Sequence, residues 1–197
     1  MFVAATEKAQ ADDEFTVVAF GDSLTAGYGL DPQDVFPLRL EQALLEKGIA
    51  ARVINAGVSG DTTAGGLARL DWSLSSKPAV MIVQLGGNDA LRGVEPATTR
   101  VNLDAIISRI RDAGVTVVLA GMYAPPNLGD AYVREFNAIF PELAKEHGIP
   151  FYPFFLEGVA AKPEYNQGDG IHPNSRGVEI IVDRFAPFLA EVIRTHY

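Results

Sequence analysis

The chain of 197 residues has a formal net charge of −9 and contains no cysteine. Because phosphate backbones and anionic lipid surfaces repel a negative chain, no nucleic-acid partner is expected. Without cysteine the chain has no disulfide, thiolate metal site or cysteine nucleophile. It could therefore fold in either a reducing or an oxidising compartment. With 48% hydrophobic and 21% charged residues, the composition is typical of a globular protein.

Residues 1–14 precede the first expected strand and are interpreted as a tail, a remnant of a signal peptide or of cloning. The pattern Ala9-Gln10-Ala11 would suit cleavage of a signal peptide after Ala11. No apolar run approaches the roughly 20 residues that span a bilayer, so integral membrane association is not expected. The sequence therefore predicts one domain over residues 15–197, and the Ala-x-Ala pattern favours export over a cytoplasmic location.

From residue 15 onward, short β-branched apolar segments alternate with longer segments of helical period. This alternation is typical of β-α units around a parallel sheet. Completely buried strands are expected at residues 15–20, 52–54, 80–85, 115–119 and near Phe151. Helices are expected at residues 35–47, 62–74, 96–113, 131–147 and 175–193, with glycines ending several of them at Gly48, Gly114 and Gly148. The fold class predicted is α/β, a three-layer α/β/α domain with a doubly wound sheet of about five parallel strands.

The segment after the first strand places a serine at the sheet edge where parallel sheets bind ligands. Residues 20–27 read Phe-Gly-Asp-Ser-Leu-Thr-Ala-Gly, and Gly21 is expected to allow a tight turn before Ser23. Ser23 can act as a nucleophile if a histidine removes its proton. Asp22 or Ser23 could instead only start a helix as its N-cap, and this motif alone leaves both interpretations open. The chain has no Gly-x-Ser-x-Gly elbow, which argues against an α/β-hydrolase fold.

Residues 168–173, Gly-Asp-Gly-Ile-His-Pro, supply a base and a carboxylate. At the spacing of Asp169 and His172, the carboxylate can accept a hydrogen bond from Nδ1–H and leave Nε2 facing outward as a base. Taken alone, Asp169 could cap a turn and His172 could be a surface side chain. The other histidines are interpreted as structural, His147 at a helix end and His196 in a frayed tail. His172 is therefore the candidate base.

Two further loops offer hydrogen-bond donors for an oxyanion. Glycines in residues 55–63 let the backbone approach a ligand closely, and the Gly60 N–H is one candidate donor. The third strand leads into Leu-Gly-Gly-Asn-Asp, where the Asn88 side chain is a second candidate, and the Ser23 N–H is a third. A glycine turn with an N-cap and an Asx turn are the structural alternatives for these two loops. Because all these groups follow strands at one sheet edge, their coincidence favours acyl transfer over unrelated caps.

Together these segments resemble the SGNH-hydrolase (GDSL) superfamily, from residue 15 to the last helix. The family is named for a Ser, a Gly, an Asn and a His, which match Ser23, Gly60, Asn88 and His172 in this sequence. The stretches Leu-Gly-Gly-Asn-Asp-Ala-Leu-Arg-Gly, Phe-Asn-Ala-Ile-Phe-Pro-Glu-Leu-Ala-Lys-Glu and Pro-Phe-Phe-Leu-Glu-Gly-Val resemble the bacterial thioesterase I/protease I/lysophospholipase L1 subgroup, often labelled arylesterase. The resemblance implies a flavodoxin-like fold, a Ser-His-Asp triad, activity on short and medium acyl esters and thioesters, and often a periplasmic or secreted location. It implies no metal.

The resemblance also implies walls for an acyl site. The family's mobile wall corresponds to residues 90–94, with Gly93 as a hinge, and residues 122–127 are expected to form another wall. The candidate substrate-binding residues in and beside these loops are Asp22, Leu24, Asp89, Leu91, Val94, Tyr123, Pro125 and Ile171. Ordinary loop packing is the alternative for Leu91 and Tyr123. Trp72 is interpreted as helix packing.

The predicted mechanism is attack of Ser23 on an acyl carbonyl, with His172 as base, Asp169 behind it and an acyl-enzyme intermediate. The expected partner is a small acyl ester or thioester, including lysophospholipids, and no cofactor or metal is expected. A carbohydrate O-acetyl esterase would use the same machinery with a more open, polar acyl pocket. A catalytically silent binding module is the alternative from another class, and the sequence leaves monomer or dimer open.

Overall fold

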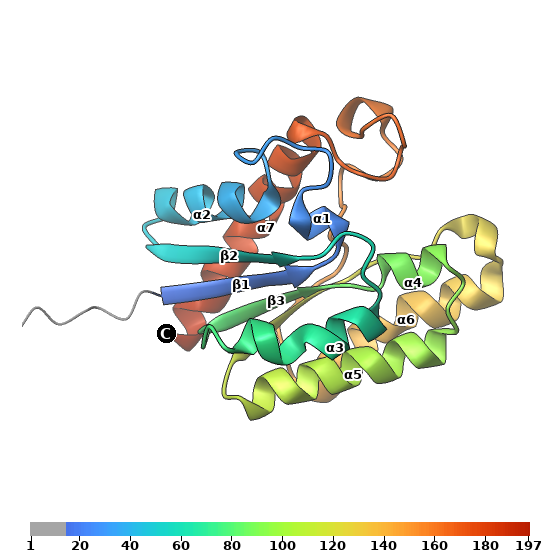
Figure 1. The fold of residues 1–197 in the computed structure, drawn as a ribbon, viewed down its shortest axis with the longest axis horizontal. Coiled ribbons are helices and arrows are strands. Elements are labelled where there is room, and N and C mark those ends of the chain that lie inside the picture. The colour runs from blue at the N-terminus through green and yellow to red at the C-terminus, as the bar shows by residue number, and fades with distance from the viewer. Residues whose placement is uncertain (1–14) are drawn as a thin grey trace, which may run out of the picture.

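A computed structural model of the chain describes residues 15–197, so the predictions for residues 1–14 lie outside the described part. In this part, five parallel strands form one sheet in the order β2-β1-β3-β4-β5, with helices on both faces (Figure 1). Flavodoxin-like sheets have this strand order. The predicted three-layer α/β/α fold is confirmed.

Every strand and long helix expected from the sequence is present, with ends that differ by up to about three residues. The strands are β1 (Phe15–Gly21), β2 (Ala51–Gly57), β3 (Val80–Gln84), β4 (Thr116–Ala120) and β5 (Phe151–Tyr152). The long helices are α2 (Phe36–Glu46), α3 (Thr63–Leu74), α5 (Pro96–Asp112), α6 (Asp130–His147) and α7 (Ser175–His196). Two short helices, α1 (Ser23–Ala26) and α4 (Gly87–Leu91), and two 3₁₀ turns, Pro126–Leu128 and Pro163–Tyr165, were not predicted.

The helices form two layers because each buries one apolar face against the sheet. Helices α2 and α7 cover one face, and α3, α5 and α6 cover the other (Figure 1). In α7 the buried side chains recur every three or four residues, at Val178, Ile181, Phe185 and Leu189. Gly48, Gly114 and Gly148 all have positive φ just beyond a helix, as predicted for residues that end helices.

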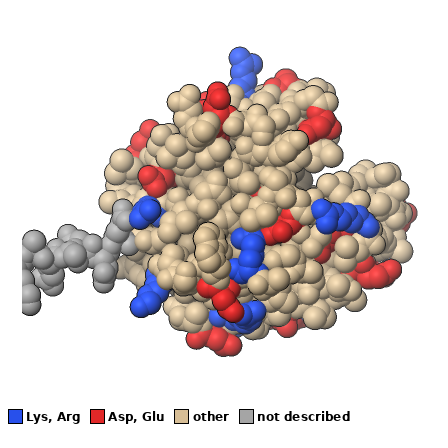
Figure 2. Space-filling view, in the orientation of Figure 1, with Lys and Arg blue, Asp and Glu red and all other residues tan. Residues whose placement is uncertain are grey.

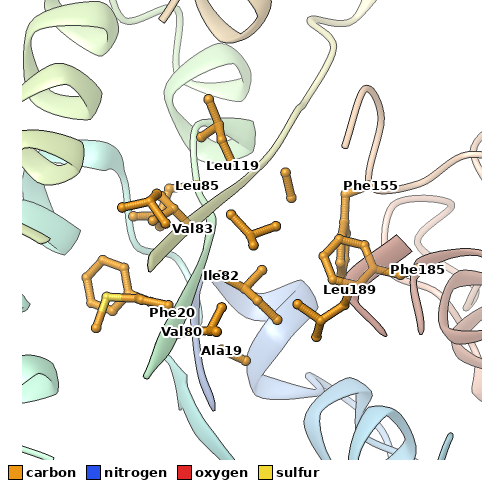
Figure 3. Close-up of a cluster of buried hydrophobic side chains, with 14 of the residues drawn as sticks. Ala19, Phe20, Val80, Ile82, Val83, Leu85, Leu119, Phe155, Phe185 and Leu189 are labelled. Carbon is orange, nitrogen blue, oxygen red and sulfur yellow. The ribbon is translucent and has the colours of Figure 1, made fainter. Parts of the chain in front are cut away.

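The central strands β1 and β3 carry the core. Figure 3 shows Phe20 on one side of these strands and Phe155, Phe185 and Leu189 on the other. Side chains from Val17 to Phe20 and from Val80 to Val83 are at most 1% exposed. Because packing fixes both faces of these strands, the residues that follow their carboxyl ends start from a rigid base.

Exposure differs from the predictions at the edges of the molecule. The edge strands are not completely buried: β2 alternates buried and exposed residues, and both residues of β5 are half-buried. An edge strand has a neighbour on one side only, and the alternation in β2 indicates that helices cover one of its faces. Trp72 does not pack between helices, because its side chain on α3 is 74% exposed.

The carboxyl end of the chain is ordered, and the prediction of a frayed tail at His196 is wrong. Helix α7 includes His196, whose Nδ1 lies 2.8 Å from the Val192 carbonyl oxygen. The Tyr197 hydroxyl donates to the Ala79 carbonyl at 2.7 Å, and its ring packs edge-on against Phe15. These contacts anchor the end of α7 beside the amino ends of the central strands.

Candidate active site

The nucleophile turn, residues 21–27, follows β1. Asp22 is the N-cap of α1, and its Oδ1 accepts a hydrogen bond from the Leu24 N–H at 3.0 Å. Ser23 is the first residue of α1 and is 8% exposed. The capping role that the sequence left open therefore belongs to Asp22, and the Ser23 hydroxyl is free for another partner.

Gly21 serves a close approach rather than the expected tight turn. Its φ is not in the left-handed region, and it is the last residue of β1. A Cβ at this position would lie 2.1 Å from Thr25 Oγ1 and 2.7 Å from the Gln84 carbonyl oxygen. Only glycine lets the start of α1 pack this closely on β3.

The base loop, residues 167–173, brings a histidine to the nucleophile turn. His172 Nε2 lies 2.9 Å from Ser23 Oγ, and His172 Nδ1 lies 2.6 Å from Asp169 Oδ2. Asp169 Oδ1 also accepts hydrogen bonds from the backbone N–H groups of Ile171 and His172, at 2.9 and 3.0 Å. Asp169 therefore caps its turn and contacts the imidazole at the same time, so the two interpretations of the sequence are compatible.

The same hydrogen bonds control the charge of Asp169. The backbone N–H of His172, the His172 side chain and the Ile171 N–H together lower the pKa of Asp169 to about 2. The carboxylate is therefore ionised at neutral pH. An ionised partner favours the Nδ1–H tautomer and leaves Nε2 as the basic nitrogen that faces Ser23.

Asp22 lies in the opposite environment. Burial raises its pKa to about 6, against the lowering effects of the Leu24 N–H, the Gln84 side chain and the charge of His172. Asp22 Oδ2 is also 3.4 Å from Asn88 Nδ2. The nucleophile turn therefore contains a buried carboxyl group that contacts the segment carrying Asn88.

The side chain of Asn88, in the first turn of α4, connects different loops. Its Nδ2 donates to the Asp61 carbonyl at 2.9 Å, in addition to its long contact with Asp22. These partners are not those of the Asx turn considered from the sequence. In the other predicted donor loop, Gly60 has a φ of +84° and its carbonyl accepts from Arg92 Nη2 at 2.7 Å. Thr62 supplies the N-cap of α3 by accepting from the Gly65 N–H.

Arg69 on α3, which was not predicted from the sequence as a site residue, bonds to the backbone at the ends of both β1 and β2. Its Nη2 donates to the Gly21 carbonyl at 2.8 Å, and its Nη1 donates to the Ala56 carbonyl at 2.9 Å. Its Nε donates to Asp61 Oδ2 at 2.5 Å, and the guanidinium lies 4.2 Å from the centre of the Phe20 ring. Arg69 therefore fixes the end of β1 relative to the loop that contains Gly60.

A cavity of about 230 Å³ opens beside Ser23 and His172, and most of its lining is apolar. Among the predicted substrate-binding residues, those that line it are Asp22, Leu24, Leu91, Tyr123, Pro125 and Ile171. Ser23, His172 and Asn88 line it as well. The structure thus brings groups from four strand ends to one hollow.

Two predicted substrate-binding residues do not line this cavity. Asp89 is 1% exposed and accepts hydrogen bonds from the Thr63 N–H at 2.9 Å and from the Thr63 and Thr99 hydroxyls. Its carboxylate therefore connects α4 to α3 and α5. Val94 contributes its carbonyl to the Tyr132 hydroxyl at 2.7 Å. Both residues follow the Asn88 segment, but they have structural partners.

The irregular segment between β5 and α7 also lines the cavity, and its part in the site was not predicted from the sequence. Its lining residues there include Leu156, Ala160, Ala161 and Asn166. Asn166 Nδ2 donates to the Val159 and Lys162 carbonyls, which fixes this segment locally. The only feature of the sequence that could have indicated this wall is its position, because the segment follows the last strand at the same sheet edge.

In residues 15–197, no group of His, Asp or Glu side chains is placed to hold a metal ion. No helix in that range is long and apolar enough to cross a membrane. On the face in Figure 2, basic side chains are interspersed with acidic ones and form no continuous patch.

The sequence and the structure resemble known esterases. The profile of the GDSL-like Lipase/Acylhydrolase family matches residues 19–180. The chain is 40% identical over 192 residues to "Thioesterase 1/protease 1/lysophospholipase L1" of Escherichia coli (strain K12), covering 97% of this chain and 90% of that protein. It is 40% identical over 197 residues to "Arylesterase" of Vibrio mimicus, covering 100% and 96%.

Among solved structures, AlinE4, described as "a SGNH-hydrolase family esterase", matches with a TM-score of 0.78 and 48% identity, covering 93% of this chain and 98% of that one. TesA matches with a TM-score of 0.84 and 39% identity, covering 88% and 97%. The chain therefore belongs to the GDSL-like lipase/acylhydrolase family, as its sequence predicts, and is a carboxylic ester hydrolase.

Proposed function

We propose that this enzyme is a serine esterase that cleaves short- to medium-chain acyl esters, acyl thioesters and lysophospholipids, with Ser23, His172 and Asp169 as its catalytic triad. The observation that carries the proposal is the 2.9 Å approach of His172 Nε2 to Ser23 Oγ at the mouth of an apolar cavity. A serine needs such a base to attack at neutral pH.

In the proposed reaction, His172 Nε2 removes the Ser23 hydroxyl proton as Oγ attacks the acyl carbon. The bond to the leaving group then breaks, and His172 donates the proton to the departing alcohol or thiol. Water attacks the acyl-enzyme, with His172 again as the base, and the acid leaves while Ser23 recovers its proton. Asp169 stabilises the imidazolium in both steps. None of these steps needs a cofactor.

The proposed oxyanion donors are the N–H groups of Ser23 and Gly60 and the side-chain amide of Asn88. An amide nitrogen carries two hydrogens. In Asn88, one of them is engaged by the Asp61 carbonyl at 2.9 Å, while the contact with Asp22 is long at 3.4 Å. The first bond holds the amide in place, and we propose that an oxyanion replaces Asp22 as the partner of the second hydrogen.

The lining of the cavity favours acyl chains over acetylated sugars. Leu24, Met122 and Leu156 contribute apolar walls, whereas a sugar ring would require several polar groups around it. The relatives named as arylesterase and as thioesterase and lysophospholipase support this range of substrates. Comparing turnover on nitrophenyl esters of increasing chain length, acyl-CoA thioesters and acetylated sugars tests the assignment, and a preference for acetylated sugars would contradict it.

Labelling by a fluorophosphonate tests the nucleophile directly. We expect stoichiometric modification of Ser23 and complete loss of esterase activity, and Ser23→Ala should abolish both labelling and turnover. Ser59 lies exposed in the Gly60 loop, so Ser59→Ala is a matched control that should still be labelled. Modification of Ser59 in the wild-type protein would refute the assignment of Ser23.

We further propose one domain over residues 15–197 and a periplasmic or secreted location. The Ala9-Gln10-Ala11 pattern and the family resemblance support export. The net charge of −9 opposes binding to nucleic acid, so the small-molecule substrate is the expected partner. Fractionation of cells that express the full natural chain tests the location, and recovery in the cytoplasm alone would contradict it.

A further inference from the structure

The ring of Tyr28 lies against the imidazole of His172. The two ring centres are 4.7 Å apart and the ring planes are inclined by 40°. Tyr28 is 54% exposed and the His172 side chain is 18% exposed, so an exposed aromatic ring contacts an imidazole that is largely shielded from solvent. Within residues 15–197 the Tyr28 hydroxyl has no hydrogen-bonding partner. The contact therefore depends on the ring rather than on the hydroxyl.

The backbone of Tyr28 forms hydrogen bonds with both the nucleophile turn and the base loop. Its N–H donates to the Ser23 carbonyl at 3.1 Å. Gln167 Nε2 donates to the Tyr28 carbonyl at 2.8 Å and to the Pro173 carbonyl at 2.9 Å. A Cβ on Gly29, which has a φ of +72°, would lie 2.3 Å from Gln167 Oε1, so glycine leaves room for this bridge. These bonds set the position of the ring relative to His172.

A ring in this position acts on the charged state of the imidazole. The face of an aromatic ring attracts a cation. The ionisable groups that face His172 are Asp169 on its own loop and Asp22 at the start of α1, and both carboxylates favour the imidazolium when ionised. Tyr28 adds a contact with a neutral aromatic ring.

We propose that Tyr28 is a positioning residue for His172: its ring keeps the imidazole aligned with Ser23 and stabilises the imidazolium that forms during acyl transfer. The inference deepens the proposed function and rests on the assignment of His172 as the base. Substitutions of Tyr28 that keep or remove the aromatic ring distinguish this role from simple shielding of His172 by an apolar side chain.

The test compares Tyr28→Phe with Tyr28→Leu, using kcat, KM and the pH dependence of kcat/KM for a soluble nitrophenyl ester. Tyr28→Phe keeps the ring and should stay within about two-fold of wild-type kcat. Tyr28→Leu keeps apolar cover but loses the ring, so kcat should fall by about two- to five-fold with little change in KM. Because the ring favours the protonated imidazole, its loss should also move the acid limb of the profile to lower pH.

Tyr123→Leu is the matched control, because Tyr123 is similarly exposed, at 48%, but stacks on Phe154 instead of His172. This change should alter KM and leave the acid limb in place. Rates are referred to the number of sites that a fluorophosphonate labels, so loss of folded protein does not affect the comparison.

Wild-type kcat and an unshifted acid limb in Tyr28→Leu would overturn the proposal, as would an equal loss in Tyr28→Phe. A change confined to KM would also overturn it and make Tyr28 a substrate contact. If Ser23 of the wild type is not labelled, the proposed function itself fails. Labelled Ser23 with an unaffected Tyr28→Leu variant removes only the role of Tyr28.

Discussion

The nucleophile turn and the base loop each contain a carboxyl group, and the two surroundings shift the pKa values of these groups in opposite directions. Asp22 is 1% exposed, and burial raises its pKa to about 6. The Asp169 side chain is 39% exposed, and hydrogen bonds from Ile171 and His172 lower its pKa to about 2. The nucleophile turn is ordered by the core beneath it, whereas the base loop is ordered mainly by hydrogen bonds within itself.

Because of this difference, substitutions in the two segments should affect stability and turnover to different extents. The core that fixes Ser23 also stabilises the fold, because β1 and β3 are buried on both faces. Asp169 and His172 make most of their contacts with each other or with the adjacent backbone. Changes in the base loop should therefore act on turnover far more than on unfolding, and changes at buried Asp22 should act on unfolding.

The largest expected effect comes from Asp169→Asn. The amide can still accept a backbone hydrogen bond, but it does not carry the charge that fixes the histidine tautomer. We expect kcat to fall by about 10²–10⁴-fold, in the range known for the equivalent change in serine proteases. Since the side chain is exposed, the midpoint of thermal unfolding should change little.

Asp71→Asn is the control for the loss of one negative charge. Asp71 on α3 is an exposed partner of Arg109 and does not line the cavity. This variant should keep the wild-type kcat. If Asp169→Asn keeps more than about a tenth of wild-type turnover, Asp169 is a turn cap without a part in the triad.

A smaller loss is expected from Asn88→Ala, because a deleted oxyanion donor weakens only the transition state. By analogy with subtilisin, kcat should fall by about 10²–10³-fold with little change in KM. The lost bond to the Asp61 carbonyl should cost about 1 kcal/mol in the free energy of unfolding. Kinetics and urea unfolding on one preparation measure both effects.

Asn102→Ala separates these two effects of Asn88. Its side chain also joins neighbouring segments, with Nδ2 donating to Thr63 Oγ1 at 3.1 Å, but it does not line the cavity. This control should cost similar stability and leave kcat near the wild-type value. A wild-type kcat in Asn88→Ala would leave Asn88 a purely structural residue.

The sequence was sufficient for the layers of the fold and for the proximity of Ser23, Asp169 and His172. Hydrophobic periodicity gave the elements, and parallel strands end at one edge, so residues after different strands must meet there. The spacing of Asp169 and His172 then fixed a local pairing that the structure contains. These predictions needed only the local hydrophobic periodicity, the spacing of Asp169 and His172, and the parallel direction of the strands.

Other features depend on contacts that no local pattern encodes. The exposure of β2 follows from its place at the sheet edge, and the burial of Asp89 follows from threonines on two other helices. The bridge from Gln167 to Tyr28 joins residues 139 positions apart. Helix α1 has four residues, too few to show a helical period.

The smallest effect in this series is expected from Asp22→Asn, and it is measured as the pH dependence of the free energy of unfolding. A carboxyl group whose pKa is raised in the folded state binds its proton more tightly there than in the unfolded chain, so stability falls as pH rises from about 4 to 6 and then levels. A shift from 3.8 to about 6 corresponds to at most about 3 kcal/mol above pH 6. Asparagine keeps the N-cap acceptor without the buried charge.

We therefore expect Asp22→Asn to match the wild type near pH 4 and to exceed it by about 1–2 kcal/mol at pH 8, after allowance for the weaker hydrogen bonds of a neutral cap. Urea unfolding at pH 4, 6 and 8 measures the difference. Asp169→Asn is the contrasting variant: because the pKa of Asp169 is lowered, its contribution is present above about pH 4 and is lost only as pH falls toward 2. Its difference from the wild type should be constant from pH 5 to 8. If the two variants show the same pH dependence over this range, burial does not distinguish the two carboxyl groups.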